Sequence, residues 1–170
     1  GAFSFYPGKN LGAYGDAGAI VCNDDRIANQ CRMIANHGSL KKHDHQIVGR
    51  NSRLDALQAS ILSVKLKFLD EWINKRNLLA ATYKSLLKDN KDIVLPKIND
   101  WSYHAYHLYV IRHEKRDELK EYLMKQGIET GIHYPKIIPN QKAYSDNKQM
   151  VTDYENAYNN ESKLVSIPLF

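Results

Sequence analysis

Cysteine is scarce in this chain of 170 residues, and several other absences exclude whole classes of protein. The two cysteines, Cys22 and Cys31, form no CxxC motif, which excludes a disulfide scaffold and a four-cysteine zinc site. No apolar run approaches the roughly 18 residues that a transmembrane helix needs. No charged segment precedes an apolar one, so the sequence shows no signal peptide. We therefore expect a cytoplasmic protein without a membrane partner.

The excess of positive charge is modest and dispersed along the chain. The formal net charge is +5, and the lysines and arginines form no concentrated stripe. Because nucleic-acid binding usually needs such a stripe, we expect no nucleic-acid partner. Modest positive charge also suits a protein whose substrates carry phosphate groups. His43 and His45 have no third ligand near them in the sequence, so no metal site is expected.

Strand patterns and helix patterns alternate along the chain. The first half predicts a loop over 1–18, a buried strand over 19–22, a helix from Asn23 or Asp24 to Gly38, and one long helix from a capping box at 52–55 to about residue 88. The second half predicts strands over 106–111 and 128–133 and helices over 116–126 and 152–164. This order indicates an α/β fold, with a small α+β domain in the second half. Both chain ends are apolar, so we expect the chain to be part of a longer protein.

Lys9 lies in the segment Pro7–Gly12, which allows several interpretations. The segment is no P-loop, because Asn10 follows the lysine, and the three-residue spacing of the later glycines does not make GxGxxG. A solvated surface lysine is the simplest interpretation. A Schiff-base lysine is another, because glycine allows close approach of a cofactor and Ser4 can bind a phosphate oxygen.

Five ordered motifs bear on this choice. They are residues 3–18 around Lys9, residues 32–38 (RMIANHG), residues 49–59 (GRNSRLDALQA), residues 130–135 (TGIHYP) and residues 166–170 (SIPLF). In this order they resemble the second half of the DegT/DnrJ/EryC1/StrS sugar aminotransferases, which use pyridoxal 5′-phosphate. The resemblance implies the end of the large α/β/α domain of a fold-type I transferase over residues 1–85, including a long connecting helix. It implies the small C-terminal α+β domain over residues 86–170.

The resemblance also implies roles for the residues that hold the cofactor. Lys9 would bind pyridoxal 5′-phosphate covalently and would move a proton between cofactor and substrate. Ser4 would hold the cofactor phosphate. Asn51 would reach the phosphate in the neighbouring subunit's site, because the family builds its active sites across a homodimer. Ala17 replaces a glycine that is usual in the family, and we expect this small change to be tolerated.

The substrate side of the site is assigned in the same way. Arg53, His133 and Tyr134 would lie near the sugar or its nucleotide. The planar guanidinium of Arg53 suits a diphosphate or a uronate, and its alternative role is to pair with Asp55 at a helix start. Family members with Asn-Ser-Arg, as at 51–53, resemble enzymes that use glutamate to aminate C3 of a nucleotide-linked 3-keto sugar. An aromatic residue after the asparagine is more usual where C4 is aminated.

Several choices stay open from the sequence. The sugar could be a dTDP-3-keto-6-deoxyhexose or a UDP-3-keto uronate, and polysaccharide or O-antigen assembly is a compatible pathway. A non-catalytic relative of the family is the alternative to an enzyme, although such a relative would have no need of Lys9. In the family, the first half of the protein supplies the aspartate that pairs with the pyridinium nitrogen. We therefore expect this chain to be inactive by itself.

Overall fold

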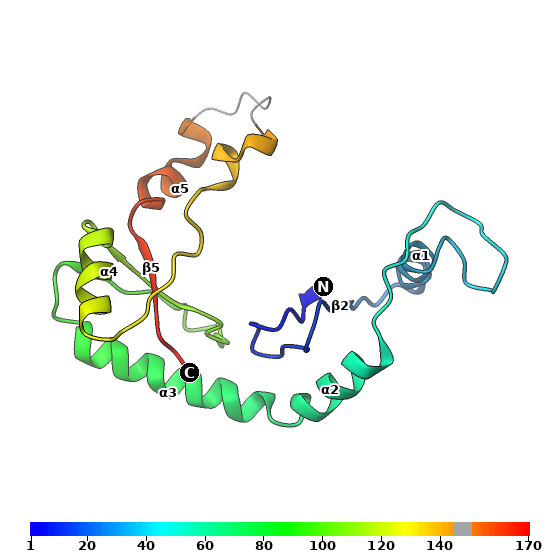
Figure 1. Ribbon diagram of the computed structural model, residues 1–170, viewed down its shortest axis with the longest axis horizontal. Coiled ribbons are helices and arrows are strands. Elements are labelled where there is room, and N and C mark those ends of the chain that lie inside the picture. The colour runs from blue at the N-terminus through cyan, green and yellow to red at the C-terminus, as the bar shows by residue number, and fades with distance from the viewer. Residues whose placement is uncertain (145–150) are drawn as a thin grey trace. The chain divides into compact units, whose positions relative to one another are not determined.

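The computed structural model describes residues 1–144 and 151–170. The chain divides into two compact units, residues 1–72 and residues 73–170, and each is described by itself (Figure 1). The division falls inside a helix, α3 (Leu69–Leu87). The domains expected from the sequence, residues 1–85 and 86–170, remain a prediction, since these units reflect only contacts within this chain.

The first unit begins with a small antiparallel sheet and continues into helices. Strand β1 (Ala2–Ser4) pairs with β2 (Gly18–Ile20), which places Ser4 opposite Gly18. Helices α1 (Asp25–Ala35) and α2 (Ala56–Leu66) follow. The expected strand at 19–22 is thus present but spans 18–20, and the prediction that it is buried is wrong, because Ile20 is 60% exposed.

Local sequence explains both ends of α1. The Asp24 carboxylate accepts the backbone N–H groups of Arg26 (2.8 Å) and Ile27 (3.2 Å), which confirms the expected N-cap. At the other end the Gly38 N–H donates to the Met33 carbonyl at 2.7 Å. Gly38 has φ +83°, and a Cβ there would lie 1.6 Å from the Ile47 carbonyl oxygen. Only glycine fits, and the returning chain therefore packs directly against the helix end.

The returning chain also shows why the predicted capping box is wrong. Asn51 pairs with Asn36, and the Ser52 N–H donates to the Ala35 carbonyl at 2.9 Å. These contacts hold residues 51–52 beside the end of α1. Helix α2 consequently starts only at Ala56, with Asp55 at its N-cap making no side-chain capping bond.

The long predicted helix is interrupted once. Two residues, Lys67 and Phe68, separate α2 from α3, and their N–H groups donate to carbonyls three residues back, Val64 (3.3 Å) and Lys65 (3.0 Å). Such tighter bonds end an α-helical turn. Apolar residues keep their spacing across the turn, so the periodicity does not reveal the break.

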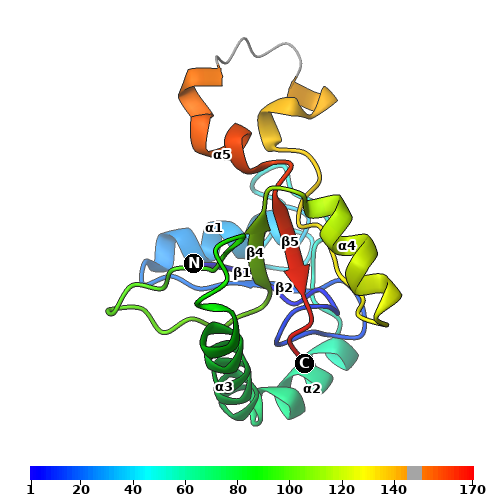
Figure 2. The same ribbon diagram turned by 90° about the vertical axis from the view of Figure 1, so that its left-hand side faces the viewer.

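The second unit is built on a three-stranded antiparallel sheet. Strand β4 (Tyr109–His113) lies between β3 (Ile93–Val94) and β5 (Leu164–Ile167), and helix α4 (Arg116–Lys125) lies beside them (Figure 2). Short 3₁₀ segments over Ile138–Asn140, Lys142–Tyr144 and Val151–Tyr154 precede α5 (Glu155–Asn160). The buried core residues are Ala80, Tyr109, Ile111, Val165 and Leu169.

Of the helices and strands predicted for this unit, some are confirmed and others are wrong. The helix over 116–126 is confirmed, and Gly127 follows it with φ +77°. The strand over 106–111 is present but starts at Tyr109. The predicted strand over 128–133 is wrong, because only Gly131 pairs, with Ser166. The predicted helix over 152–164 is also wrong in extent: α5 ends at Asn160 and the chain then enters β5.

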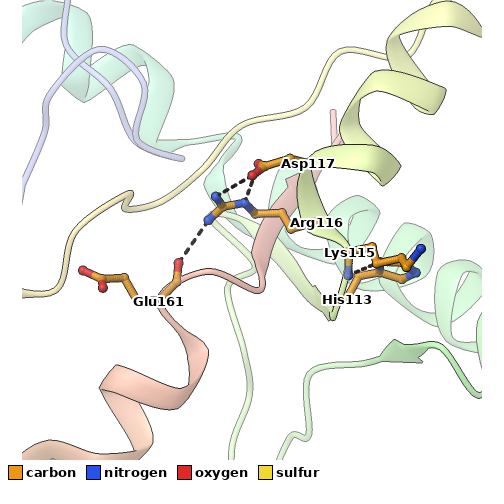
Figure 3. Close-up of polar contacts among 5 residues, drawn as sticks. All are labelled: His113, Lys115, Arg116, Asp117 and Glu161. Atoms are coloured by element: carbon orange, nitrogen blue, oxygen red, sulfur yellow. Dashed lines mark hydrogen bonds and ion pairs between the residues drawn. The ribbon is translucent and has the colours of Figure 1, made fainter. Parts of the chain in front are cut away.

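Arg116 anchors two neighbouring segments at the start of α4. Its guanidinium donates to the Glu161 carbonyl at 3.0 Å and to the Asp117 carboxylate at 2.9 Å (Figure 3). The bond from Arg116 lowers the pKa of the Asp117 carboxyl from its ordinary value. The Glu161 carboxylate points away from Arg116 and accepts the Ile137 N–H at 2.7 Å. The chain that follows the TGIHYP motif is thereby tied to the start of α4.

Candidate functional site

The Lys9 loop, residues 5–17, is closed by its own backbone. The Phe5 N–H donates to the Ala17 carbonyl and the Ala13 N–H to the Phe5 carbonyl, each at 2.8 Å. Within the loop, the Lys9 N–H donates to the Tyr6 carbonyl at 2.8 Å. Lys9 itself is half-buried. These bonds hold the lysine on a tight turn directly after β1.

Gly12 makes this turn possible. A Cβ at Gly12 would lie 2.2 Å from the Pro7 carbonyl oxygen and 3.1 Å from the Lys9 carbonyl oxygen. The backbone of residue 12 therefore crosses directly over the peptide group of residue 7, where no side chain fits. The glycine is required by space at this point.

Ser4 lies at the end of β1, five residues before Lys9. Its side chain is exposed and its hydroxyl oxygen accepts the Tyr6 N–H at 3.3 Å, and a hydroxyl that accepts in this way can still donate its hydrogen to another acceptor. The end of β1 and the loop that follows it thus carry a hydroxyl donor and an amine. An amine can form an imine with an aldehyde, and a hydroxyl can bind phosphate, so this donor set fits pyridoxal 5′-phosphate.

Two residues of α2 that the sequence reasoning did not single out contact the far side of the Lys9 loop. The Gln58 side-chain oxygen accepts the Tyr14 N–H at 2.8 Å. The Lys65 ammonium donates to the Gly12 carbonyl and lies 5.5 Å from the centre of the Tyr14 ring. Gln58 and Lys65 are two helical turns apart, and this spacing on one face was the only sequence signal for the pair.

Asn51 and Arg53 lie together before α2. The Arg53 Nε donates to the Asn51 side-chain oxygen at 3.1 Å, and both residues are exposed. The alternative role of Arg53, an ion pair with Asp55, is not present among the described residues. The structure therefore brings these two predicted site residues into contact.

A hollow of about 860 Å³ adjoins β1 and β2 in the first unit. It is lined in part by Phe3, Gly18, Cys31, Ser52 and Arg53. Its volume is within the range of small-ligand sites. Asp16 and Ala17, at the end of the Lys9 loop, also line it, whereas Lys9, Ser4 and Asn51 do not, so within this unit Arg53 borders a space that Lys9 itself does not line.

His133 and Tyr134 belong to the second unit. His133 Nδ1 lies 2.9 Å from the hydroxyl oxygen of Ser166, which is 5% exposed. Gly131 and Ser166 exchange two backbone hydrogen bonds, of 2.9 and 2.8 Å, which fix the histidine over β5. Tyr134 is 69% exposed. Lys9 belongs to the first unit, so the structure of the second unit alone gives no distance between the lysine and these two residues.

Features that two other kinds of site require are absent from the described residues. Within residues 1–144 and 151–170, no helix is long and apolar enough to span a membrane. The same part of the chain contains no cluster of three or more histidine, cysteine, aspartate or glutamate side chains placed to hold a metal. In the loop after α1, His45 Nδ1 instead lies 2.8 Å from the His37 carbonyl oxygen.

Known proteins match most or nearly all of the chain. The erythromycin biosynthesis sensory transduction protein EryC1 of Saccharopolyspora erythraea is 48% identical over 85% of this chain and 40% of its own length. The dTDP-3-amino-3,6-dideoxy-α-D-galactopyranose transaminase of Aneurinibacillus thermoaerophilus is 45% identical over 98% of this chain and 50% of its own. The chain thus spans about half, or less, of these curated relatives.

A solved structure shows the same fold. The crystal structure of S. venezuelae DesV in complex with a ketimine intermediate is 40% identical, with a TM-score of 0.95 over 99% of this chain and 45% of that chain. The predicted α/β fold class is confirmed by this likeness. The DegT/DnrJ/EryC1/StrS aminotransferase family matches residues 1–170. The resemblance seen in the five motifs is therefore confirmed, and the chain belongs to the DegT/DnrJ/EryC1/StrS aminotransferase family.

Proposed function

We propose that the protein containing this chain is a pyridoxal 5′-phosphate-dependent nucleotide-sugar aminotransferase. The observation that carries the proposal is the Lys9 loop, in which a half-buried lysine is held on a closed turn five residues after the Ser4 hydroxyl. Similarity to a transaminase at 45% identity and to DesV, solved with a ketimine intermediate, supports the same chemistry. Residues 1–85 would complete the large domain of the enzyme and residues 86–170 the small one.

Different residues of this chain would bind the cofactor and transfer the proton. Pyridoxal 5′-phosphate, when bound, supplies an aldehyde and a ring that withdraws electrons from the reacting carbon. Lys9 Nζ would hold the cofactor covalently and would later move the proton as general base and acid. Ser4 Oγ would donate a hydrogen bond to the phosphate. Asn51, exposed and supported by Arg53, would donate to the phosphate in the partner subunit of a homodimer.

We place the reaction at C3 of a nucleotide-linked 3-keto sugar, with glutamate as the amino donor. The name of the A. thermoaerophilus relative, a 3-amino sugar transaminase, supports this position. Ser52 leaves room beside Asn51, where a tyrosine would suit amination at C4. The exposed Arg53 would bind the nucleotide diphosphate or a uronate. His133 and Tyr134 would contact the substrate from the small domain. A C4 reaction is the alternative, and the sugar could be a dTDP-6-deoxyhexose or a UDP uronate.

The proposal is tested by trapping the cofactor on the complete protein. The protein is incubated with pyridoxal 5′-phosphate, reduced with borohydride, and the modified lysine is mapped by mass spectrometry. We expect the label on Lys9 and its loss in Lys9→Ala, while the exposed Lys41→Ala serves as a matched control that keeps the label. A folded protein with no label on Lys9 would overturn the proposal.

The position of amination needs a separate measurement. A purified dTDP-linked 3-keto sugar and the corresponding 4-keto sugar are offered with glutamate, and the aminated carbon is identified by NMR. We expect turnover of the 3-keto substrate only. Amination at C4 would overturn the assignment of the position and leave the aminotransferase activity intact.

The name of EryC1, a sensory transduction protein, favours a second candidate, a regulatory relative without catalytic activity. Such a protein could keep the fold and even bind the cofactor. Adding glutamate distinguishes the two candidates. An aminotransferase would take the amino group of glutamate, and the absorbance of its bound cofactor would change. A labelled Lys9 with no spectral change on adding glutamate would support the regulatory candidate.

A further inference from the structure

We propose that Gln58 and Lys65 of α2 are positioning residues that hold the loop carrying Lys9 and so set the orientation of its amine. The inference rests on the proposed function only in its last step, the link to the cofactor. The hold on the loop is a property of this chain and can be measured without any cofactor.

Gln58 fixes the end of the loop by one backbone hydrogen bond. Its side-chain oxygen accepts the Tyr14 N–H at 2.8 Å. A Cβ at Gly15 would lie 3.5 Å from the Gln58 Nε2, so the amide lies close along the backbone of residues 14 and 15. Gln58 is half-buried, while the hydrogen bond itself is exposed to solvent, so the amide adds one backbone contact to the loop without being shielded from water.

Lys65 fixes the middle of the loop by a charge-assisted bond. Its ammonium donates to the carbonyl of Gly12, a residue that is itself buried. The same ammonium lies 5.5 Å from the centre of the Tyr14 ring, within the range of a cation–π contact. Lys65 is half-buried, and its ammonium binds the backbone of the loop.

Geometry transmits this hold to Lys9. Gly12 crosses directly over Pro7 and Lys9, and a Cβ on it would lie 3.1 Å from the Lys9 carbonyl oxygen. A shift of Gly12 therefore displaces the peptide groups on both sides of the lysine. Because Gln58 and Lys65 project from a helix, they give the loop a rigid reference, which a catalytic amine needs for a defined direction.

The experiment compares removal and retention of each bond in the complete protein. Gln58→Leu removes the acceptor and Gln58→Glu keeps an oxygen in its place. Lys65→Met removes the cation and Lys65→Arg keeps it. Gln30→Leu, on the exposed surface of α1, and the exposed Lys67→Met make the same chemical changes away from the loop. Amide hydrogen exchange of a peptide covering residues 5–18 is measured without cofactor, and the rate of borohydride-trapped labelling of Lys9 is measured with it.

We expect Gln58→Leu and Lys65→Met to speed exchange of the peptide covering residues 5–18, with its affected amides exchanging about tenfold faster, the effect of one lost hydrogen bond. Labelling of Lys9 should slow several-fold in the same variants, and Gln58→Glu and Lys65→Arg should restore both values. The two control variants should match the unsubstituted protein in both measurements.

Two failures are distinguishable. Unchanged exchange in both Gln58→Leu and Lys65→Met would overturn this inference even if Lys9 is labelled normally. An absence of label on Lys9 in the unsubstituted protein would overturn the proposed function, while faster exchange in the variants would still establish the hold on the loop.

Discussion

A single added methyl group at Gly12 should disable the Lys9 loop. In Gly12→Ala the new Cβ would lie 2.2 Å from the Pro7 carbonyl oxygen and 2.8 Å from the Pro7 carbonyl carbon, both backbone atoms. Real Cβ atoms essentially never approach within 3.0 Å of such an atom. The crossing of residue 12 over residue 7 must therefore open, and it cannot be relieved by rotating a side chain.

The size of the effect follows from the cost of overpacking. Inserting one methylene into a packed site costs about 1–3 kcal/mol. At about 1.4 kcal/mol for each factor of ten, the equilibrium constant for closing the loop should fall roughly 5- to 150-fold. Gly8→Ala is the matched control in the same loop, because its Cβ would meet only the Tyr6 ring at 3.8 Å, an ordinary contact.

The assay measures the rate at which Lys9 is trapped by pyridoxal 5′-phosphate and borohydride in the complete protein. We expect Gly12→Ala to be labelled at least fivefold more slowly and Gly8→Ala to be labelled at the normal rate. Far-ultraviolet circular dichroism confirms that each variant is folded. The reasoning is refuted if Gly12→Ala is labelled normally, or if Gly8→Ala is impaired to the same extent.

Three further predictions concern the rest of the chain. Arg76→Leu removes a guanidinium that donates to the carbonyls of Tyr106 (3.0 Å) and Leu169 (2.8 Å). We therefore expect the free energy of unfolding, measured in urea, to fall by about 2–4 kcal/mol. An unchanged unfolding midpoint would contradict this prediction. Burial raises the pKa of the Tyr109 hydroxyl, so folding favours its protonated form. The stability that this group contributes should be fully present below about pH 10, its ordinary pKa, and should be lost as the pH rises further. In thermal melts, Tyr109→Phe should make this loss of stability at high pH less steep. In mixtures of Lys9→Ala and Asn51→Ala subunits, a shared site would regenerate about a quarter of the normal active sites, whereas no recovery would show that Asn51 acts within its own subunit.

Features encoded by neighbouring residues were predicted well. The Asp24 cap of α1 and the Gly127 end of α4 depend on residues a few positions apart, and both are present as expected. The Lys9 turn also belongs here, because the glycine-rich segment that closes it is continuous in the sequence. Recognition of the family rested on five such local motifs, each readable without the fold.

Features that depend on distant partners were missed. Helix α2 starts late because residues 51–52 bond to the end of α1, and no local pattern near Ser52 reveals that neighbour. The chain after Asn160 enters a strand because β4 offers it a free edge, which outweighs its helical pattern. The hold of α2 on the loop went unnoticed for the same reason.

The sequence by itself determined the family and was enough to propose Lys9 as the reactive lysine, because each rests on residues within short segments. Only the tertiary structure decided which side chains support the Lys9 loop. Gln58 bonds to a residue 44 positions away and Lys65 to one 53 positions away. A hydrogen bond across that separation exists only once the intervening helices have folded and brought the two segments together, so no local pattern of residue types could disclose it.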